Sequence, residues 1–197
     1  MPEIVLDEAT HTYRVGGIVY PSVTQIIDPA HFGDEWYATR GTYIHQMIEM
    51  HVKGTLDEEN LDPQLRPYLD AFKKFQVEAP HVKGIGDIKS GAKMLWHLLQ
   101  IAAYKELWLN GIDPEGKPLK ETLQGQEVMG YHPLYQYCGK IDILNVPEEG
   151  YPETFDLYLQ DTGKYRLERI PQVRMWTHVR NFLMLAKGWH VRKEYKL

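Results

Sequence analysis

The sequence of 197 residues predicts a single α/β (α+β) domain, with a small mixed central sheet flanked by helices and an N-terminal β-hairpin. Three observations lead to this fold class. Hydrophobic residues make up 43% of the chain and charged residues 25%, as is usual for a globular protein with a core. Apolar residues recur at helical spacing in some segments, and short segments rich in β-branched and aromatic residues lie between them. The sequence contains no internal repeat, so residues 1–197 are expected to form one domain.

Residues 1–33 are expected to form N-terminal strands. Segments 12–15 and 18–20 are rich in β-branched and aromatic residues, and they flank Gly16-Gly17, a dipeptide typical of hairpin turns. A short helix is predicted at 23–27 because a serine, which favours helix N-termini, comes directly before it. The hairpin and this helix would therefore precede the core of the domain.

Residues 34–170 are expected to form that core, which starts with two helices. Apolar residues recur every three or four positions over 34–53 and again over about 63–77. Gly54 would end the first helix, and an acidic loop separates it from the second. These two helices are expected to cover one side of the sheet.

The core centres on a predicted strand over 82–89 and a predicted helix over 92–110, with Leu95 on its apolar face. Asp87 and Lys89 are one residue apart in the strand, so their side chains are expected on the same face. A carboxylate beside an ammonium group at a strand end suits a metal-dependent hydrolytic site. The alternative is a surface ion pair, which would contribute little to stability.

The rest of the core is expected to consist of strands, followed by a C-terminal helix and a basic tail over 171–197. Strands are predicted at 126–131, 136–144, 155–160 and 164–170. The last two would form a hairpin because Asp-Thr-Gly lies between them.

Composition narrows the class of protein. No segment approaches the roughly 20 apolar residues that a membrane-spanning helix needs, and the acidic N-terminus does not resemble a signal peptide. The single cysteine, Cys138, excludes an internal disulfide and a cysteine-only metal or iron–sulfur site within one chain. We therefore expect a cytoplasmic protein without a membrane partner. The net charge of −5 argues against indiscriminate binding of nucleic acid and leaves room for a local basic groove.

Two further residues are candidates for a metal site, each with a simpler interpretation. Asp142 lies in a strand among β-branched neighbours, where a carboxylate is costly to bury unless it is paired or binds a metal. The simpler interpretation is that Asp142 faces outward from an amphipathic strand. His45 is more often a hydrogen-bonded helix histidine than a ligand, and Gln100 and Tyr104 would then be polar positions at the edge of the core.

Four segments together resemble the motifs of RecB-like nucleases in the PD-(D/E)XK superfamily, in the branch that includes phage exonucleases. Arg40-Gly41-Thr42-Tyr43-Ile44-His45 resembles the Arg-Gly-Thr-x-x-His helix motif. Asp87-Ile88-Lys89-Ser90-Gly91 is similar to the Asp-x-Lys-Thr/Ser-Gly motif, and Gly139-Lys140-Ile141-Asp142 to the Gly-x-x-Asp strand. Gln100-Ile101-Ala102-Ala103-Tyr104 is similar to the Gln-x-x-x-Tyr helix motif. The start of the chain, His11 to Thr24, also resembles the beginning of phage-encoded members. The resemblance implies a restriction-endonuclease-like core.

The order of the motifs departs from that family. There, the Gly-x-x-Asp strand precedes the Asp-x-Lys strand, whereas here Asp142 follows Asp87 and the helix that carries Gln100. A natural rearrangement, an engineered permutation and a coincidental match are the alternatives. We favour a rearrangement, because residues 126–144 also keep the expected Glu127. This interpretation requires the late strand to return to a position beside the Asp-x-Lys strand, with the Asp142 carboxylate within a few ångströms of Asp87.

The resemblance implies metal-assisted hydrolysis of DNA phosphodiester bonds, leaving 5′-phosphates. Mg²⁺ or Mn²⁺ would be held by the side chains of His45, Asp87 and Asp142 and by the backbone carbonyl of Ile88. Lys89 would orient or deprotonate the attacking water or stabilise the phosphoryl oxygens. Gln100 and Tyr104 would support the site, and Glu127 would support a metal ligand. The residues expected to contact DNA are Arg40, Lys93, Lys140 and Ser90.

Within this resemblance, the single cysteine and the absence of a helicase motif favour a stand-alone exonuclease. It would act in phage or prophage recombination or replication, in the host cytoplasm if phage-encoded. Its substrate would be linear duplex or single-stranded DNA, and a single-strand annealing or recombination protein is considered as a partner. A restriction-type or structure-specific endonuclease is one alternative. A non-catalytic DNA-binding recombination-partner module with a degenerate site is the other.

Overall fold

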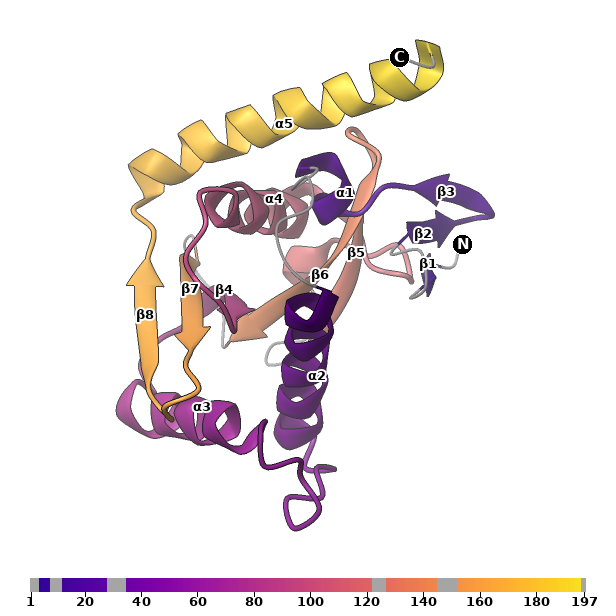
Figure 1. The fold of residues 1–197 in the computed structure, drawn as a ribbon. Coiled ribbons are helices and arrows are strands. Elements are labelled where there is room, and N and C mark those ends of the chain that lie inside the picture. Colours follow the sequence, from indigo (N-terminus) through magenta and orange to yellow (C-terminus); the bar gives the residue numbers. More distant parts are fainter. Residues whose placement is uncertain (1–3, 8–11, 28–34, 122–126, 145–151, 196–197) are drawn as a thin grey trace.

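The computed structural model describes residues 4–7, 12–27, 35–121, 127–144 and 152–195. In strands and helices at the ends of these ranges, the side chains of residues 35–38, 127–128, 142–144 and 195 lie outside the description. The described chain forms a mixed α+β fold with two sheets and flanking helices, which confirms the predicted fold class (Figure 1).

The first sheet is N-terminal, antiparallel and three-stranded. Its strands, in spatial order, are β1 (Ile4–Asp7), β2 (Thr12–Val15) and β3 (Ile18–Tyr20). The turn between β2 and β3 uses Gly16 and Gly17, whose φ angles of 57° and 84° are the positive values that a tight hairpin turn needs. The predicted hairpin is thus present, and β1 extends it by one strand.

The second sheet is central and five-stranded. Its strands, in spatial order, are β5 (Glu127–His132), β6 (Tyr137–Leu144), β4 (Gly84–Lys89), β7 (Glu153–Leu159) and β8 (Tyr165–Arg169). Strand β4 pairs parallel with β7 and antiparallel with β6, so the sheet is mixed. The strand pair β5–β6 comes late in the sequence and nevertheless lies directly beside β4.

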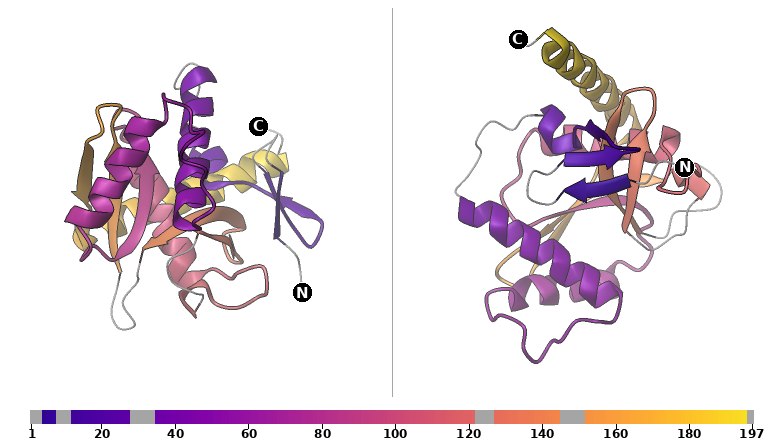
Figure 2. Two further views of the ribbon diagram at one scale, coloured as in Figure 1. Left: turned by 90° about the horizontal axis from the view of Figure 1, so that it is seen from below. Right: turned by 90° about the vertical axis from the view of Figure 1, so that its right-hand side faces the viewer.

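Helices cover both faces of the central sheet. The helices are α1 (Val23–Ile27), α2 (Glu35–Val52), α3 (Arg66–Glu78), α4 (His97–Asn110) and α5 (Gln172–Tyr195), with a short 3-10 helix at Leu119–Glu121. Helices α4 and α5 lie on one side and α3 on the other (Figure 1), and α2 lies beside α3 (Figure 2). None of the described helices is long and apolar enough to cross a membrane.

The sheet separates two apolar cores, because neighbouring residues in a strand point to opposite faces. Ile85 and Ile141 pack with Leu107 of α4 and Phe182 of α5. On the other face, the core contains residues of β4, β7, α2 and α3, among them Ile88, Phe155, Leu157, Ile44 and Phe72. Strands β4 and β7 are therefore covered on both sides, and polar residues in them must be buried.

Two predicted boundaries are wrong. Helix α5 continues to Tyr195, through most of the segment that was expected to form a basic tail. The helix expected from residue 92 begins at His97, and Leu95 is 86% exposed instead of lying on an apolar face. The chain between Ser90 and His97 forms turns in which the Met94 amide donates to His97 Nδ1 at 3.3 Å and the His97 amide to the Met94 carbonyl. These local hydrogen bonds, with His97 itself buried, fix the helix start five residues later than apolar spacing suggests.

Candidate functional site

Four of the predicted site residues form one chain of hydrogen bonds. Lys89 Nζ donates to Asp87 Oδ2 and to Gln100 Oε1, both at 2.6 Å. Gln100 Nε2 donates to the Tyr104 hydroxyl at 3.0 Å. The structure therefore brings together the Asp-x-Lys segment of β4 and the Gln-x-x-x-Tyr segment of α4.

These hydrogen bonds follow from the periodic directions of the side chains in β4 and in α4. Asp87 and Lys89 are two residues apart in β4, so both point toward α4. Gln100 and Tyr104 are four residues apart in α4, so they lie one turn apart on the same face of the helix. The Lys89 ammonium also lies 5.5 Å from the centre of the Trp96 ring, within the range of a cation–π contact.

The Asp87–Lys89 pair is buried. The side chains are 5% and 9% exposed, so the interpretation of this pair as a surface ion pair is wrong. Such a pair must be compensated by its own contacts, because removing two charges from water costs several kcal/mol each. Lys89 meets that requirement with the Asp87 carboxylate, the Gln100 carbonyl and the Trp96 ring.

A second buried carboxyl group lies beside the first, and it was not among the predicted site residues. Asp156 of β7 is the partner of Asp87 in the parallel register, and it is completely buried. Its Oδ2 accepts a hydrogen bond from the Tyr158 hydroxyl at 3.4 Å, whereas its Oδ1 has no hydrogen-bond partner among the described residues. Burial, with the negative charge of Asp87, raises the pKa of Asp156 to about 7.

His97 and Tyr158 complete the polar surroundings of these carboxyl groups. His97 Nδ1 lies 3.2 Å from the Tyr158 hydroxyl, which also contacts Asp156. Burial and then the positive charge of Lys89 lower the pKa of His97 to about 4, so its imidazole is neutral near pH 7. A neutral imidazole adds no charge to the buried site.

Sequence reasoning missed Asp156, His97 and Tyr158 for different reasons. Asp156 stands between Phe155 and Leu157 in a strand, the same signal that marked Asp142 as a candidate. That signal could have found Asp156. His97 and Tyr158 carry no local signal, because their polar contacts come from other elements.

The Gly-x-x-Asp strand lies beside the Asp-x-Lys strand, although the chain order differs from that of the family it resembles. The ladder between β4 and β6 runs from Gly84–Leu144 to Gly86–Asp142, so the Asp142 backbone is opposite Gly86, one residue before Asp87. Glu127 of β5 is opposite Asp142 in turn. The side chains of Asp142 and Glu127 lie outside the described residues, so the distance between the Asp142 and Asp87 carboxylates stays a prediction.

Gly139 of this strand contacts the motif on α4. A Cβ atom at Gly139 would lie 3.1 Å from Tyr104 Cε1 and 3.3 Å from both Leu107 Cδ2 and Val23 Cγ2. Glycine therefore allows α1 and α4 to pack closely on β6. Through Tyr104, the Gly-x-x-Asp and Gln-x-x-x-Tyr segments are in direct contact.

The Arg-Gly-Thr-x-x-His segment meets the end of β4 through its arginine. Arg40 Nη2 donates to the Ser90 carbonyl at 3.2 Å, which joins α2 to the residue that follows Lys89. His45 is half-buried on α2, and Ile88 packs its side chain in the α2–α3 core. The metal-binding roles predicted for His45 and the Ile88 carbonyl stay predictions.

Two further residues that were predicted to contact DNA interact with acidic residues of the protein itself. Lys93 forms an ion pair with Glu168 of β8, and both side chains are partly exposed. Lys140 faces α2: the pKa of Glu49 is lowered by its hydrogen bond to Lys53 and, more weakly, by the charge of Lys140. Neither observation shows a contact with DNA.

The donor set fits a hard divalent cation in part. Asp87 and Asp156 supply carboxylate oxygens, one of them without a hydrogen-bond partner among the described residues, and Mg²⁺ commonly uses one or two carboxylates with substrate phosphates and waters. Among the side chains that the structure describes, no group of three or more His, Cys, Asp and Glu residues is placed to hold a metal ion. A third protein ligand would have to come from a side chain outside that set, and Asp142 is the one the sequence predicts.

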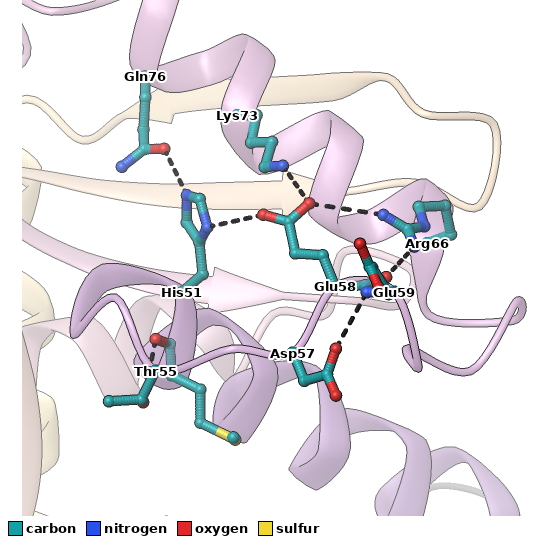
Figure 3. A network of polar contacts seen from close by, with 9 residues as sticks. His51, Thr55, Asp57, Glu58, Glu59, Arg66, Lys73 and Gln76 are labelled. Carbon is teal, nitrogen blue, oxygen red and sulfur yellow. Dashed lines mark hydrogen bonds and ion pairs between the residues drawn. The ribbon is translucent and has the colours of Figure 1, made fainter.

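A second cluster of charged residues lies between α2 and α3, away from this site (Figure 3). Glu58 accepts a hydrogen bond from Lys73 at 2.6 Å and contacts Arg66, while His51 Nδ1 lies 3.7 Å from its other oxygen. His51 Nε2 also lies 3.1 Å from Gln76 Oε1. This cluster, called the Glu58 network below, fastens the loop after α2 to α3.

Comparison of the chain with family models, with curated proteins and with solved structures gives no match.

Proposed function

We propose that the protein is a metal-dependent deoxyribonuclease that hydrolyses phosphodiester bonds in DNA, with exonuclease action in phage or prophage recombination or replication. The observation that carries this proposal is the buried contact of Lys89 with Asp87 and Gln100 at one end of β4. The position of β6 beside β4 supports it at the level of strand order only, because the backbone of Asp142 pairs with Gly86 and not with Asp87.

In this proposal Lys89 acts on a phosphate group. Its ammonium is held by two oxygen acceptors, so its position is defined before any substrate binds. A positioned cation can orient a water molecule or stabilise negative charge that develops on phosphoryl oxygens. When bound, Mg²⁺ or Mn²⁺ would supply Lewis-acid chemistry. Gln100 and Tyr104 would keep the lysine in place, since Gln100 links the two.

Arg40 and Ser90 mark the expected path of the DNA backbone. Arg40 reaches the Ser90 carbonyl directly after Lys89, so a phosphate bound at the site would lie near a guanidinium group. Lys93 would contribute after exchanging Glu168 for a phosphate. The partner in this proposal is linear duplex or single-stranded DNA, with a recombination protein as a further partner in the host cytoplasm.

The test is digestion of linear DNA labelled at the 5′ or the 3′ end, with Mn²⁺ or Mg²⁺, by the full-length protein and two variants. Asp87→Asn keeps the shape of the side chain and removes its charge, and we expect it to abolish metal-dependent hydrolysis. Asp161→Asn, in the exposed turn between β7 and β8, removes the same charge elsewhere and should digest DNA like the wild type.

The outcomes separate the alternatives. Circular duplex should survive an exonuclease, whereas cutting of the circle would favour the restriction-type or structure-specific endonuclease. Wild-type protein that binds DNA without metal-dependent hydrolysis would overturn the proposal and favour a non-catalytic recombination module. Equal hydrolysis by wild type and Asp87→Asn would show that the active site lies elsewhere.

A further inference from the structure

The central sheet holds two carboxyl groups side by side, and among the described residues only Asp87 forms an ion pair. Asp87 and Asp156 are register partners on parallel strands, whose backbones are about 4.8 Å apart, and they share a face of the sheet. Lys89 bonds Asp87 at 2.6 Å. Among the described residues, the hydrogen bond to Asp156 comes only from Tyr158, which is uncharged.

The unsatisfied oxygen of Asp156 needs an explanation. Oδ1 is buried without a hydrogen-bond partner among the described residues, and an unpaired buried carboxylate is among the most costly groups in a folded protein. Protonation alone does not resolve this, because a hydroxyl on Oδ1 would itself be a buried donor without an acceptor in the same set of residues. A proton on Oδ2 would still leave Oδ1 as a buried carbonyl oxygen without a donor among the described residues. Buried charged groups in proteins are found paired or coordinating a metal ion.

We propose that Asp156 is a ligand of the divalent cation and shares it with Asp87. This inference rests on the proposed metal-dependent function and extends it to a residue outside the motifs that suggested it. A cation between the two carboxylates would give Oδ1 its missing partner and would offset their mutual repulsion. Tyr158, which is hydrogen-bonded to Asp156 and lies 3.2 Å from His97, would then position the carboxylate.

Glu168 provides a matched control on the same face of the sheet. It is the register partner of Asp156 across β7 and β8, so Glu168→Gln removes one negative charge from the next strand. Unlike Asp156, Glu168 is partly exposed and already has a cationic partner in Lys93. A general effect of negative charge would appear in both variants, whereas ligation would appear only in Asp156→Asn.

The experiment is titration calorimetry of Mn²⁺ into the full-length protein, without DNA, together with thermal unfolding with and without Mn²⁺. We expect Asp87→Asn and Asp156→Asn each to weaken Mn²⁺ binding by about 10- to 100-fold, the range found when residues that support metal ligands are removed. Glu168→Gln should bind Mn²⁺ like the wild type. The increase in unfolding temperature that Mn²⁺ gives the wild type should be lost in Asp156→Asn, each protein being compared with its own metal-free form.

The outcomes distinguish failure of this inference from failure of the proposed nuclease function. Wild-type affinity in Asp156→Asn, with lost affinity in Asp87→Asn, would overturn the inference and leave the nuclease proposal standing. Absence of Mn²⁺ binding by the wild type would overturn both. Equal weakening in Glu168→Gln would also overturn the inference, since charge alone would explain it. If Asp156→Asn does not fold, Asp156→Ser, which is smaller and uncharged, is measured in the same way.

Discussion

Two charged clusters in this protein have similar composition and opposite surroundings. In the buried cluster, Lys89 bonds Asp87 at 2.6 Å, and their side chains are 9% and 5% exposed. In the Glu58 network, Lys73 bonds Glu58 at the same 2.6 Å, and the side chains are 38% and 36% exposed (Figure 3). The two ion pairs therefore have equal nitrogen–oxygen distances, although much less water surrounds the Asp87–Lys89 pair.

The difference in exposure determines how much stability each ion pair loses when one partner is removed. Removing one partner of a buried pair leaves a charge without water or counter-charge, whereas an exposed partner is simply hydrated. The Glu58 network is also redundant, because Glu58 contacts Lys73, Arg66 and His51. Among the described residues, the buried cluster has no such redundancy, since Lys89 is the common donor to Asp87 and Gln100.

The largest effect is expected from Lys89→Met, which keeps the length of the side chain and removes its charge. It leaves the Asp87 carboxylate and the Gln100 carbonyl without their common donor. We expect the free energy of unfolding to fall by about 3–5 kcal/mol, as when one partner of a buried ion pair is removed. Urea unfolding followed by circular dichroism measures this change.

Lys73→Met is the matched control, since it makes the same substitution at an equally short ion pair in the Glu58 network. Its effect on the urea midpoint should be a small fraction of that of Lys89→Met. Similar midpoints for the two variants would contradict the distinction between the clusters. The double variant Asp87→Asn/Lys89→Met should be less destabilised than the sum of the single changes, because it no longer buries an unpaired charge.

A smaller effect within the buried cluster is the dependence of the free energy of unfolding on pH, which His97 causes. The pKa of His97 is lowered to about 4 by burial and then by the charge of Lys89, whereas in the unfolded chain it is near 6.5. Between these values the unfolded chain binds a proton that the folded protein does not, so this histidine costs stability as pH falls from 6.5 toward 4. The cost reaches about 3 kcal/mol at the lower end of that window.

His97→Asn isolates this contribution because asparagine cannot take up the proton. The stability difference between wild type and variant should favour the wild type most above pH 6.5 and decrease steadily down to pH 4. Asp156 acts in the opposite direction, since its pKa is raised, and it is present in both proteins. A difference that does not vary with pH would show that His97 is not held neutral by its surroundings.

The buried cluster also shows what the sequence could predict. Strand periodicity was sufficient to place Asp87 and Lys89 on one face, and helix periodicity placed Gln100 and Tyr104 one turn apart. What periodicity could not supply is which segments become neighbours. Asp156 joins Asp87 only because β7 pairs parallel with β4, a long-range choice that no local pattern in β7 encodes.

The same limit explains the error at the start of α4 and the case of Asp142. Leu95 has suitable spacing for an apolar helix face, yet local turns and the burial of His97 start the helix after it. For β6, the motif resemblance required a late strand to lie beside an early one, and the structure places it there. The role of Asp142 stays a prediction, because its side chain lies outside the described residues.

The smallest effect is expected in the Glu58 network, from Glu58→Gln. Its neighbours Lys73, Arg66 and His51 are solvent-accessible and become hydrated when the carboxylate is lost. The expected shift in the urea midpoint is slight at low ionic strength and disappears in about 1 M salt, where the screening length is about 3 Å. The deficit of Lys89→Met should persist in the same salt, because ions do not reach a buried pair. If the stability losses of both variants depended on salt, Lys89 and Asp87 would be accessible to solvent ions. The buried cluster would then not be a desolvated site.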